Sequence, residues 1–220
     1  MPNGADRLVW IDCEMTGLDP AIDEIVEIAA IVTDGDLNEL DAGVSFVVRP
    51  GDASLAQMDD VVVTMHTESG LIEEIPNGIA LAEAEGLVLE YVKQHAPEAR
   101  KAPLAGSSVY VDRGFLARYM PDLDNHLHYR LVDVSSVKEM VRRWYPRVYF
   151  ATPEKRGNHR ALGDIRESIA ELRYYRDAAF VPQPGPDTST AQAIGQSHID
   201  RKSTRLNSSH IPLSRMPSSA

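Results

Sequence analysis

The sequence predicts an α/β fold in which a mixed β-sheet is flanked by helices. Two observations carry this prediction: three apolar, β-rich runs follow one another closely near the N-terminus, and two shorter apolar runs then alternate with stretches of helical periodicity. The chain has 220 residues, of which 43% are hydrophobic and 25% are charged, as in an ordinary globular protein of about one domain. A chain of this length can bury a sizeable core.

Three consecutive strands are expected in the N-terminal part of the chain: Leu8–Glu14, Ile25–Thr33 and Val44–Val48. The first strand ends in the turn-forming segment Thr16–Pro20, and Arg49–Gly51 stops the third. The centre of the second strand, Glu27–Ala30, also fits a helix. Because the links between the three runs are short, we expect an antiparallel meander.

The rest of the chain is predicted to alternate helices with two buried strands. Helical spacing places Leu81, Ala84 and Val88 near one face of the first of these helices. The two short apolar runs that follow complete a sheet of five strands. In chain order, the expected elements are a helix, a strand, a helix, a strand and two helices: Ile79–His95, Pro103–Ala105, Arg113–Met120, Tyr129–Val134, Ser136–Tyr145 and about Arg160–Ala179.

The composition narrows the classes of function. No apolar run approaches the roughly 18 residues of a membrane helix, and the N-terminus lacks the order of a secretory signal, so we expect a cytoplasmic protein. The net charge of -11 argues against binding long nucleic acid, because neutralising many phosphates needs clustered Lys and Arg. It is compatible with a short substrate held through bound cations. The single cysteine, Cys13, lies inside a predicted strand and is expected to be a packed side chain.

The C-terminal part of the chain differs in composition from the rest. Residues 181–199 are rich in Pro, Gly, Ser, Thr and Gln and are expected to form a flexible extension. Residues 200–220 carry, against one acid, four basic residues: Arg201, Lys202, Arg205 and Arg215. This segment looks like one reading frame of a common short-read sequencing adapter, so we expect it to be non-native. The alternative is a basic arm that binds nucleic acid.

Two acids stand at the end of the first predicted strand. Asp12 and Glu14 are two residues apart, so both side chains leave the same face with backbones roughly 6.7 Å apart. Carboxylates so placed can share a pair of metal ions about 4 Å apart. Bound cations would also relieve the repulsion and desolvation of two acids in so apolar a strand. The alternative is that the strand ends there and both acids are solvated.

Three later residues are candidates for the same chemistry. Asp112 precedes a helical stretch, where an ordinary helix N-cap is the alternative. Asp164 lies beside the apolar face of the last helix and can point toward the sheet, or it can be an acid at the rim. His159 lies five residues earlier, which is about 140° on a straight helix, so we expect it at or before the helix start. There it can act as a general base, or it can be an exposed loop histidine.

Taken together, these five residues resemble the DEDDh exonucleases. Within that superfamily, the motifs look like those of the oligoribonucleases over roughly residues 8–180, which are expected to form the exonuclease domain. The motifs are Trp10–Asp19, Met65–His66, Ser69–Leu71, His128–Arg130, Asp133–Ser135 and Asp164–Ser168. The segment Phe180–Pro186 is similar to actinobacterial members.

The resemblance implies a ribonuclease H-like fold and a homodimer. It implies two Mg²⁺ or Mn²⁺ ions held by Asp12, Glu14, Asp112 and Asp164, and a His159 that takes a proton from the attacking water. The implied reaction is 3'-to-5' hydrolysis of very short RNA, chiefly dinucleotides, to nucleoside 5'-monophosphates.

The resemblance also implies a set of substrate-binding residues. Four of them would cap the 5' phosphate and limit the site to about two nucleotides: Ser108, Tyr129, Arg130 and Ser135. Four others would lie at the 3' end, with Leu18 as a wedge against the bases: Met15, Thr16, Leu18 and His66. Ordinary turn and strand packing is the alternative for Leu18 and Met15.

Three positions depart from the family pattern. Ser107 stands where Asn is usual, Val61 where many members carry an aromatic residue, and Gly114 where a larger residue is common. Loss of an aromatic at position 61 would remove base stacking worth about 1–3 kcal/mol. These departures leave open a nucleotide-binding module that has lost catalysis. Two further alternatives are a DNA-directed exonuclease of the same superfamily and an acidic structural domain, which would require every motif to be a coincidence.

Overall fold

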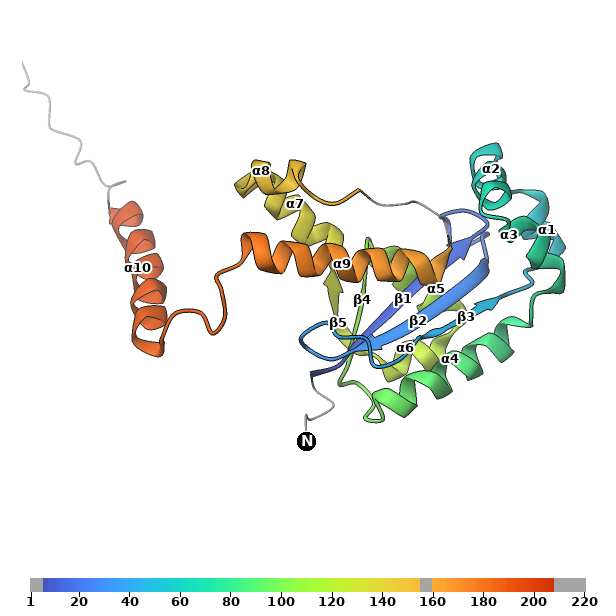
Figure 1. The fold of residues 1–220 in the computed structure, drawn as a ribbon, viewed down its shortest axis with the longest axis horizontal. Helices are drawn as coiled ribbons and strands as arrows, with labels where there is room; N and C mark the ends of the chain where they lie inside the picture. Colours follow the sequence, from blue (N-terminus) through green and yellow to red (C-terminus); the bar gives the residue numbers. More distant parts are fainter. Residues whose placement is uncertain (1–5, 155–159, 208–220) are drawn as a thin grey trace, which may run out of the picture. The chain divides into compact units, whose positions relative to one another are not determined.

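A five-stranded mixed β-sheet forms the centre of the protein. The computed structural model describes residues 6–154 and 160–207. The sheet has the order β3-β2-β1-β4-β5 (Figure 1). Its strands are β1 (Leu8–Met15), β2 (Ile25–Thr33), β3 (Val44–Val47), β4 (Pro103–Gly106) and β5 (His128–Asp133). The first three strands pair in antiparallel fashion, whereas β4 and β5 run parallel to β1. The predicted fold class and antiparallel meander are confirmed.

Helices cover both faces of the sheet. The helix α9 (Ala161–Ala179) packs on one face against β1 and β2, with α7 (Val134–Trp144) beside it. On the other face lie α4 (Leu81–His95), α5 (Tyr110–Tyr119) and α6 (Pro121–His126). Short helices α1 (Asp52–Ala56), α2 (Asp60–Glu68), α3 (Leu71–Glu74) and η2 (Ile75–Asn77) lie together at one end of β1 and β2 (Figure 1). The remaining short helix of this unit is α8 (Pro146–Phe150).

The short helices α1, α2, α3, η2, α6 and α8 were not predicted from the sequence. Each has nine residues or fewer, too few turns to show a hydrophobic period. The predicted start of α5 was wrong, because the helix begins at Tyr110 and not at Arg113, so Asp112 lies inside the first turn. The strand β5 begins and ends one residue earlier than expected.

Strand β1 decides which face carries the acids. Its residues Val9, Ile11 and Cys13 pack into the core with α4 and α5, whereas Trp10 packs into the core beneath α9. Because side chains alternate along a strand, Asp12 and Glu14 share the Trp10 side and face α9. All nine residues of β2 are buried, which holds β1 rigidly at the centre of the sheet.

The apolar stripe of α9 fixes that helix on the same face. Ala161, Ile165 and Ile169 are buried against Trp10, and Leu172 is partly buried there. These residues recur at helical spacing, as the sequence predicted. Asp164 precedes the buried Ile165 in the first turn. The packing of α9 therefore brings Asp164 to the end of β1 where Asp12 and Glu14 lie.

The chain divides into two compact units, Met1–Phe180 and Val181–Ala220. The second unit contains a helix, α10 (Thr188–Asn207), that the sequence analysis did not predict within the expected extension. Residues 208–220, most of the segment that resembles an adapter, lie outside the described residues. Within residues 6–154 and 160–207, no helix is both long and apolar enough to cross a membrane.

Candidate active site

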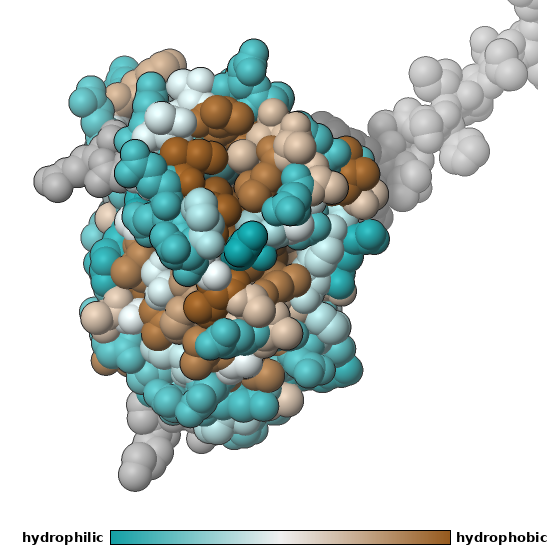
Figure 2. All heavy atoms as spheres, turned by 90° about the vertical axis from the view of Figure 1, so that its right-hand side faces the viewer, coloured by the Kyte–Doolittle hydropathy of each residue, from teal (hydrophilic) through white to brown (hydrophobic). Residues whose placement is uncertain are grey.

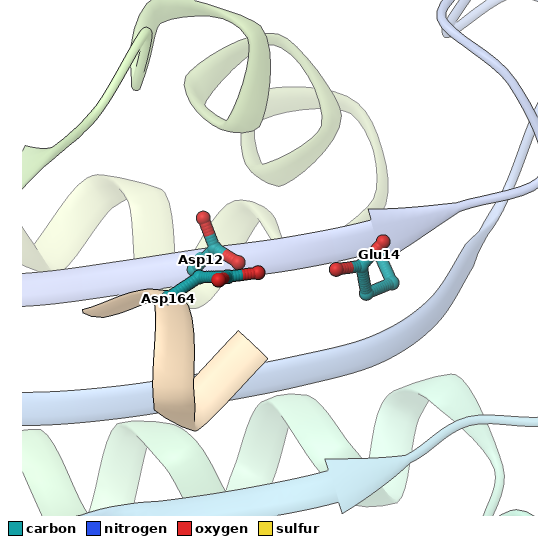
Figure 3. A group of neighbouring side chains, drawn as sticks. All are labelled: Asp12, Glu14 and Asp164. Atoms are coloured by element: carbon teal, nitrogen blue, oxygen red, sulfur yellow. The ribbon is translucent and has the colours of Figure 1, made fainter. Parts of the chain in front are cut away.

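Three carboxylates converge where β1 meets the start of α9. Asp12 and Glu14 project from the strand and Asp164 from the first turn of the helix, and one oxygen of each lies within 4.8 Å of the others. Figure 3 shows the carboxylates of Asp12 and Asp164 side by side, with that of Glu14 turned toward them. The predicted convergence of strand and helix acids is therefore present in the structure.

Asp112 joins this site through the backbone of β1. The parallel pairing of β4 with β1 extends only to Trp10, because the chain leaves β4 after Gly106. The carboxylate of Asp112 accepts the N–H of Cys13 at 2.9 Å and so continues the edge of the sheet where β4 has ended. Asp112 is 6% exposed. This bond places the carboxylate of Asp112 against β1, one residue after Asp12.

Burial and mutual repulsion raise the pKa values of these acids. Burial, followed by the charges of Asp112, Glu14 and Asp164, raises the pKa of Asp12 well above its ordinary value. Burial raises the pKa of Glu14 to about 8, with Asp164 as the next contributor. The pKa of Asp112 rises to about 7, again mainly through burial. Ionising these carboxylates costs free energy because they are buried and repel one another. A bound cation offsets that cost, so the site favours cation binding.

The donor set fits a hard divalent cation. Asp12, Glu14 and Asp164 offer only carboxylate oxygens, and no other group of three or more metal-ligating side chains is found in the described part of the chain. Oxygen ligands suit Mg²⁺ and Mn²⁺, whereas structural zinc sites are dominated by cysteine and histidine.

A second pair of charges borders the acidic cluster. Glu27 lies directly opposite Glu14 across the β1–β2 pair and is 1% exposed. Its carboxylate accepts a hydrogen bond from Arg160 at 3.1 Å. Arg160 lowers the pKa of Glu14 against the larger effects of burial, Asp164, Glu27 and Asp112. His159, the predicted general base, lies outside the described residues.

The loop between β1 and β2 is held rigidly and presents Leu18 to solvent. Thr16 donates its hydroxyl to the buried Asp23 at 3.0 Å, and the N–H of Asp19 donates to the same carboxylate at 2.9 Å. Leu18, between them, is 76% exposed. A Cβ at Gly17 would lie 2.4 Å from an oxygen of Asp23, so a larger residue there would displace the carboxylate that holds the loop.

Exposed apolar side chains gather at this end of the molecule. Figure 2 shows the face on which α1, α2 and α3 lie, with hydrophobic side chains grouped among polar ones. The exposed large apolar residues of the β1–β2 loop and of α2 are Leu18, Ile22, Val61 and Val63. A surface of this kind can pack against flat apolar groups such as bases.

His66 lies beneath this surface with one ring nitrogen unpaired. Its Nε2 is 2.9 Å from the carbonyl oxygen of Met15, and the side chain is fully buried. Because a carbonyl oxygen only accepts, Nε2 is the donor of this hydrogen bond, and in the neutral ring Nδ1 is an acceptor. Among the described residues Nδ1 finds no hydrogen-bond partner.

The predicted phosphate-binding residues form two groups. The hydroxyls of Ser108 and Ser135 are 3.0 Å apart, and Asp133 holds both residues by accepting their N–H groups at 2.9 Å. Tyr129 and Arg130 lie on β5, where the guanidinium of Arg130 is 5.5 Å from the Tyr129 ring centre. The structure thus brings the two serines together and pairs the two β5 residues.

The three departures from the family pattern differ in their surroundings. The hydroxyl of Ser107 accepts a hydrogen bond from Ser168 at 3.2 Å, which links the loop before α5 to α9. Val61 is 76% exposed. A Cβ at Gly114 would meet no atom within 4 Å.

Sequence reasoning missed four residues that shape the site: Asp23, Glu27, Asp133 and Arg160. A signal existed for Glu27, because a lone acid in an otherwise apolar strand needs a partner when it is buried. Asp133 belongs to the motif Asp133–Ser135 that carries the resemblance, although no role was assigned to it, whereas nothing distinguished Asp23 from an ordinary turn residue.

Comparison with known proteins agrees with this geometry. The profile of the family RNase_T, described as Exonuclease, matches residues 9–172. A Leifsonia xyli subsp. xyli protein named Oligoribonuclease is 61% identical over 206 residues, covering 94% of this chain and 100% of that protein. Proteins of the same name from Streptomyces avermitilis and Mycobacterium tuberculosis are 63% and 58% identical, covering 88% and 86% of this chain and 97% and 88% of theirs.

Solved structures of exonuclease I have the same fold. One has a TM-score of 0.60 at 16% identity and covers 78% of this chain. E. coli exonuclease I in complex with a dA16 oligonucleotide has a TM-score of 0.60 at 18% identity and covers 79%. In both cases the chain spans 41% of the length of the exonuclease I chain. This likeness concerns the fold and confirms the predicted ribonuclease H-like class.

Proposed function

The chain belongs to the RNase_T exonucleases and, within them, to the oligoribonucleases, and we propose that it hydrolyses very short RNA from the 3' end to nucleoside 5'-monophosphates. The observation that carries the proposal is the convergence of Asp12, Glu14 and Asp164 in a chain about 60% identical to proteins named Oligoribonuclease. An enzyme of this family is a hydrolase, which excludes the purely structural hypothesis.

Asp12, Glu14, Asp112 and Asp164 would hold the metal ions. When bound, two Mg²⁺ or Mn²⁺ ions would supply a water of lowered pKa and stabilise charge on the departing 3' oxygen. The raised pKa values of Asp12 and Glu14 support this assignment, because the carboxylates are buried close together. Asp112 would contribute from the first turn of α5, where its Oδ1 already accepts the N–H of Cys13.

His159 would accept the proton of the attacking water. Its position immediately before Arg160 supports this role, because Arg160 is tied to the border of the carboxylate cluster. Histidine has a pKa near neutrality and so can exchange a proton at physiological pH.

Met15, Thr16, Leu18 and His66 would bind the 3' nucleotide. Leu18 is exposed on a rigid loop, as a wedge between or against bases requires. The Nδ1 of His66 is an acceptor without a partner among the described residues and could receive a hydroxyl of the substrate. A ribose hydroxyl at the 3' end has the matching donor.

Ser108, Ser135, Tyr129 and Arg130 would bind the 5' phosphate and so select very short substrates. The paired serine hydroxyls offer donors held in place by Asp133. Arg130 supplies the planar fork that phosphate oxygens favour. A site closed in this way at the 5' end would accept two nucleotides better than a long chain.

We also propose a homodimer and a cytoplasmic location, where short RNA fragments arise. Exposed aromatic side chains of β5, α7 and α8 support the dimer, because a monomer rarely exposes so many large apolar groups in neighbouring elements. They are Tyr129, Trp144, Tyr145 and Phe150.

The test is hydrolysis of a 5'-phosphorylated diribonucleotide against a longer RNA, with Mn²⁺ and with a chelator. We expect cleavage that requires Mn²⁺, favours the dinucleotide, and is lost in Asp12→Ala. Binding of the dinucleotide without cleavage would support the module that has lost catalysis. Equal cleavage of a deoxyribose dinucleotide would instead support the DNA-directed exonuclease.

A further inference from the structure

A buried ion pair lies immediately behind the carboxylate cluster. The side chain of Glu27 is 2% exposed and that of Arg160 is 33% exposed. Both carboxylate oxygens of Glu27 lie 3.2 Å from the Nε of Arg160, and one of them lies 3.1 Å from its Nη2. The same guanidinium also pairs with Glu74 of α3 through two further contacts of 2.8 and 3.1 Å. Arg160 is therefore held by two acids from different elements.

Glu27 also caps the start of α9. Its Oε2 accepts the N–H of Ala161, the first residue of the helix, at 3.2 Å. Arg160, the N-cap residue, makes no side-chain cap of its own. The first N–H groups of a helix lack partners within the helix, and a carboxylate there also interacts favourably with the helix dipole. A residue of β2 thus fixes where α9 begins.

The capped end of α9 is the end that carries Asp164. Asp164 follows Ala161 by three residues, which is less than one turn, and its N–H donates to the carbonyl of Arg160 at 3.1 Å. On the strand side, Glu27 is the register partner of Glu14. One side chain, Glu27, therefore connects the two elements whose carboxylates must meet.

We infer that Glu27 and Arg160 are positioning residues that hold Asp164 at a fixed distance from Asp12 and Glu14 for cation binding. This inference rests on the proposed metal-dependent function. Glu27 is not itself a ligand in this arrangement, because Arg160, Ala161 and Ser45 already occupy its oxygens. Residues that orient metal ligands in this way typically change metal affinity by about 10-fold to 100-fold when they are replaced.

Charge and position make opposite predictions for Arg160→Met. This change removes a positive charge at the border of the carboxylate cluster that would hold the metal ions, so electrostatics alone would tighten cation binding. Loss of position would weaken it. Glu27→Asp tests position without a change of charge. It keeps the carboxylate but shortens the side chain by one methylene, which moves the carboxylate away from Arg160 and Ala161.

The experiment is Mn²⁺ binding to the full chain in the absence of substrate, by calorimetry, with kcat and KM for the dinucleotide measured in parallel. We expect Arg160→Met and Glu27→Asp to weaken Mn²⁺ binding by about tenfold or more and to lower kcat with little change in KM. Arg160→Lys should rescue binding only in part, because an ammonium cannot reproduce the fork. Mn²⁺ binding is measured without substrate because it does not depend on His159, which neighbours Arg160 in the sequence and is not a metal ligand in the proposed site.

Arg166→Met is the matched control. Arg166 is on the same helix and contacts Glu39 and the carbonyl of Ala42, away from the carboxylates. It should leave Mn²⁺ affinity unchanged. Should Arg160→Met fail to fold by circular dichroism, Glu27→Asp and Arg160→Lys decide the question.

Wild-type affinity, or tighter binding, in folded Arg160→Met and Glu27→Asp would overturn the inference while leaving the proposed function intact. A wild-type protein that neither binds Mn²⁺ nor cleaves the dinucleotide would instead contradict the proposed function.

Discussion

At the scale of single residues, the site brings several carboxylates close together, and ionising them lowers the stability of the folded state. Glu14 and Asp112 are buried and Asp12 is partly buried, and each lies near at least one other carboxylate. Burial and repulsion both favour the protonated acid, and a bound cation reverses that preference. The same arrangement of acids therefore lowers the stability of the metal-free protein and raises its affinity for a cation.

The pH dependence of the metal-free protein should show this cost. Folding raises the pKa of Glu14 to about 8 and that of Asp112 to about 7, so the folded state binds more protons than the unfolded state between about pH 4 and 8. Stability must therefore fall as pH rises through this window. We expect the Tm of the chelator-treated protein to be lower at pH 8 than at pH 5.5.

Two comparisons check the cause. Adding Mn²⁺ at pH 8 should raise the Tm again, because the cation binds only the folded arrangement. In Asp12→Asn the slope between pH 5.5 and 8 should be smaller, since one charge of the cluster is gone. A metal-free Tm that rises toward pH 8 would show that the acids are paired and not repelling.

Arg130 allows a test of how the substrate's length is selected. In Arg130→Ala the loss of a charge-assisted hydrogen bond to phosphate should raise KM for a 5'-phosphorylated diribonucleotide roughly tenfold or more. The same variant should cleave a diribonucleotide with a 5' hydroxyl as well as the wild type does. Unchanged kinetics on the phosphorylated substrate would place Arg130 outside the phosphate site and favour a DNA-directed exonuclease.

Some of these residue assignments could be made from sequence and others could not. The spacing of Asp12 and Glu14 predicted that both lie on one face of a strand, and in the structure the carboxylate of Asp164, also a predicted candidate, lies beside them. The partners of the buried polar groups could not be predicted from the sequence. Glu27, for example, pairs with Arg160, which is 133 residues away along the chain. Such pairings depend on how strands and helices pack, which no local pattern encodes.

At the scale of elements, the long periodic segments were predictable and the short ones were not. β2 was predicted with its observed bounds, and the structure decides against the helix that its centre, Glu27–Ala30, also allowed: all nine residues are buried in a strand. The helices between β3 and α4 escaped notice because each spans fewer than three turns. Their place in the fold is set by contacts such as Val48 with Ile79.

The link between β2 and β3 supplies a prediction at this scale. Gly43 has a φ of 76°, and a Cβ there would lie 2.6 Å from Cγ1 of Ile31 and 2.7 Å from the carbonyl oxygen of Ala30. Gly43→Ala should therefore lower the free energy of unfolding by about 1–3 kcal/mol, through a strained backbone and a clash with the core strand. Urea denaturation measures this.

Gly114→Ala is the matched change, with the opposite expected sign. Gly114 lies inside α5, has an ordinary φ, and has open space around its Cβ position. Alanine there should raise the free energy of unfolding by about 0.5–1 kcal/mol, because glycine is a poor helix former. If both variants shift stability in the same direction, the local geometry of these two glycines is not what decides their effect.

At the scale of the whole molecule, the sheet, the two apolar cores and the carboxylate cluster all belong to the unit Met1–Phe180. The long elements of this unit bury an apolar face, so hydrophobic periodicity predicted them, whereas the short helix α8 has no buried residue and was not predicted. The unit Val181–Ala220 offers no comparable stripe, and α10 is the one helix or strand among its described residues, 181–207. A polar helix of that kind has no sequence signal that separates it from an extension.

A chain that ends at Phe180 should therefore keep its fold and its chemistry. All described members of the three apolar clusters precede Val181, so the truncation removes none of the buried apolar surface that stabilises the sheet. We expect its Tm to lie within about 2 °C of the full chain and its kcat/KM on the diribonucleotide to be unchanged. A large loss of activity with an unchanged Tm would mean that residues after Phe180 contact the substrate or a second copy. A lower Tm would mean that they cover part of the core.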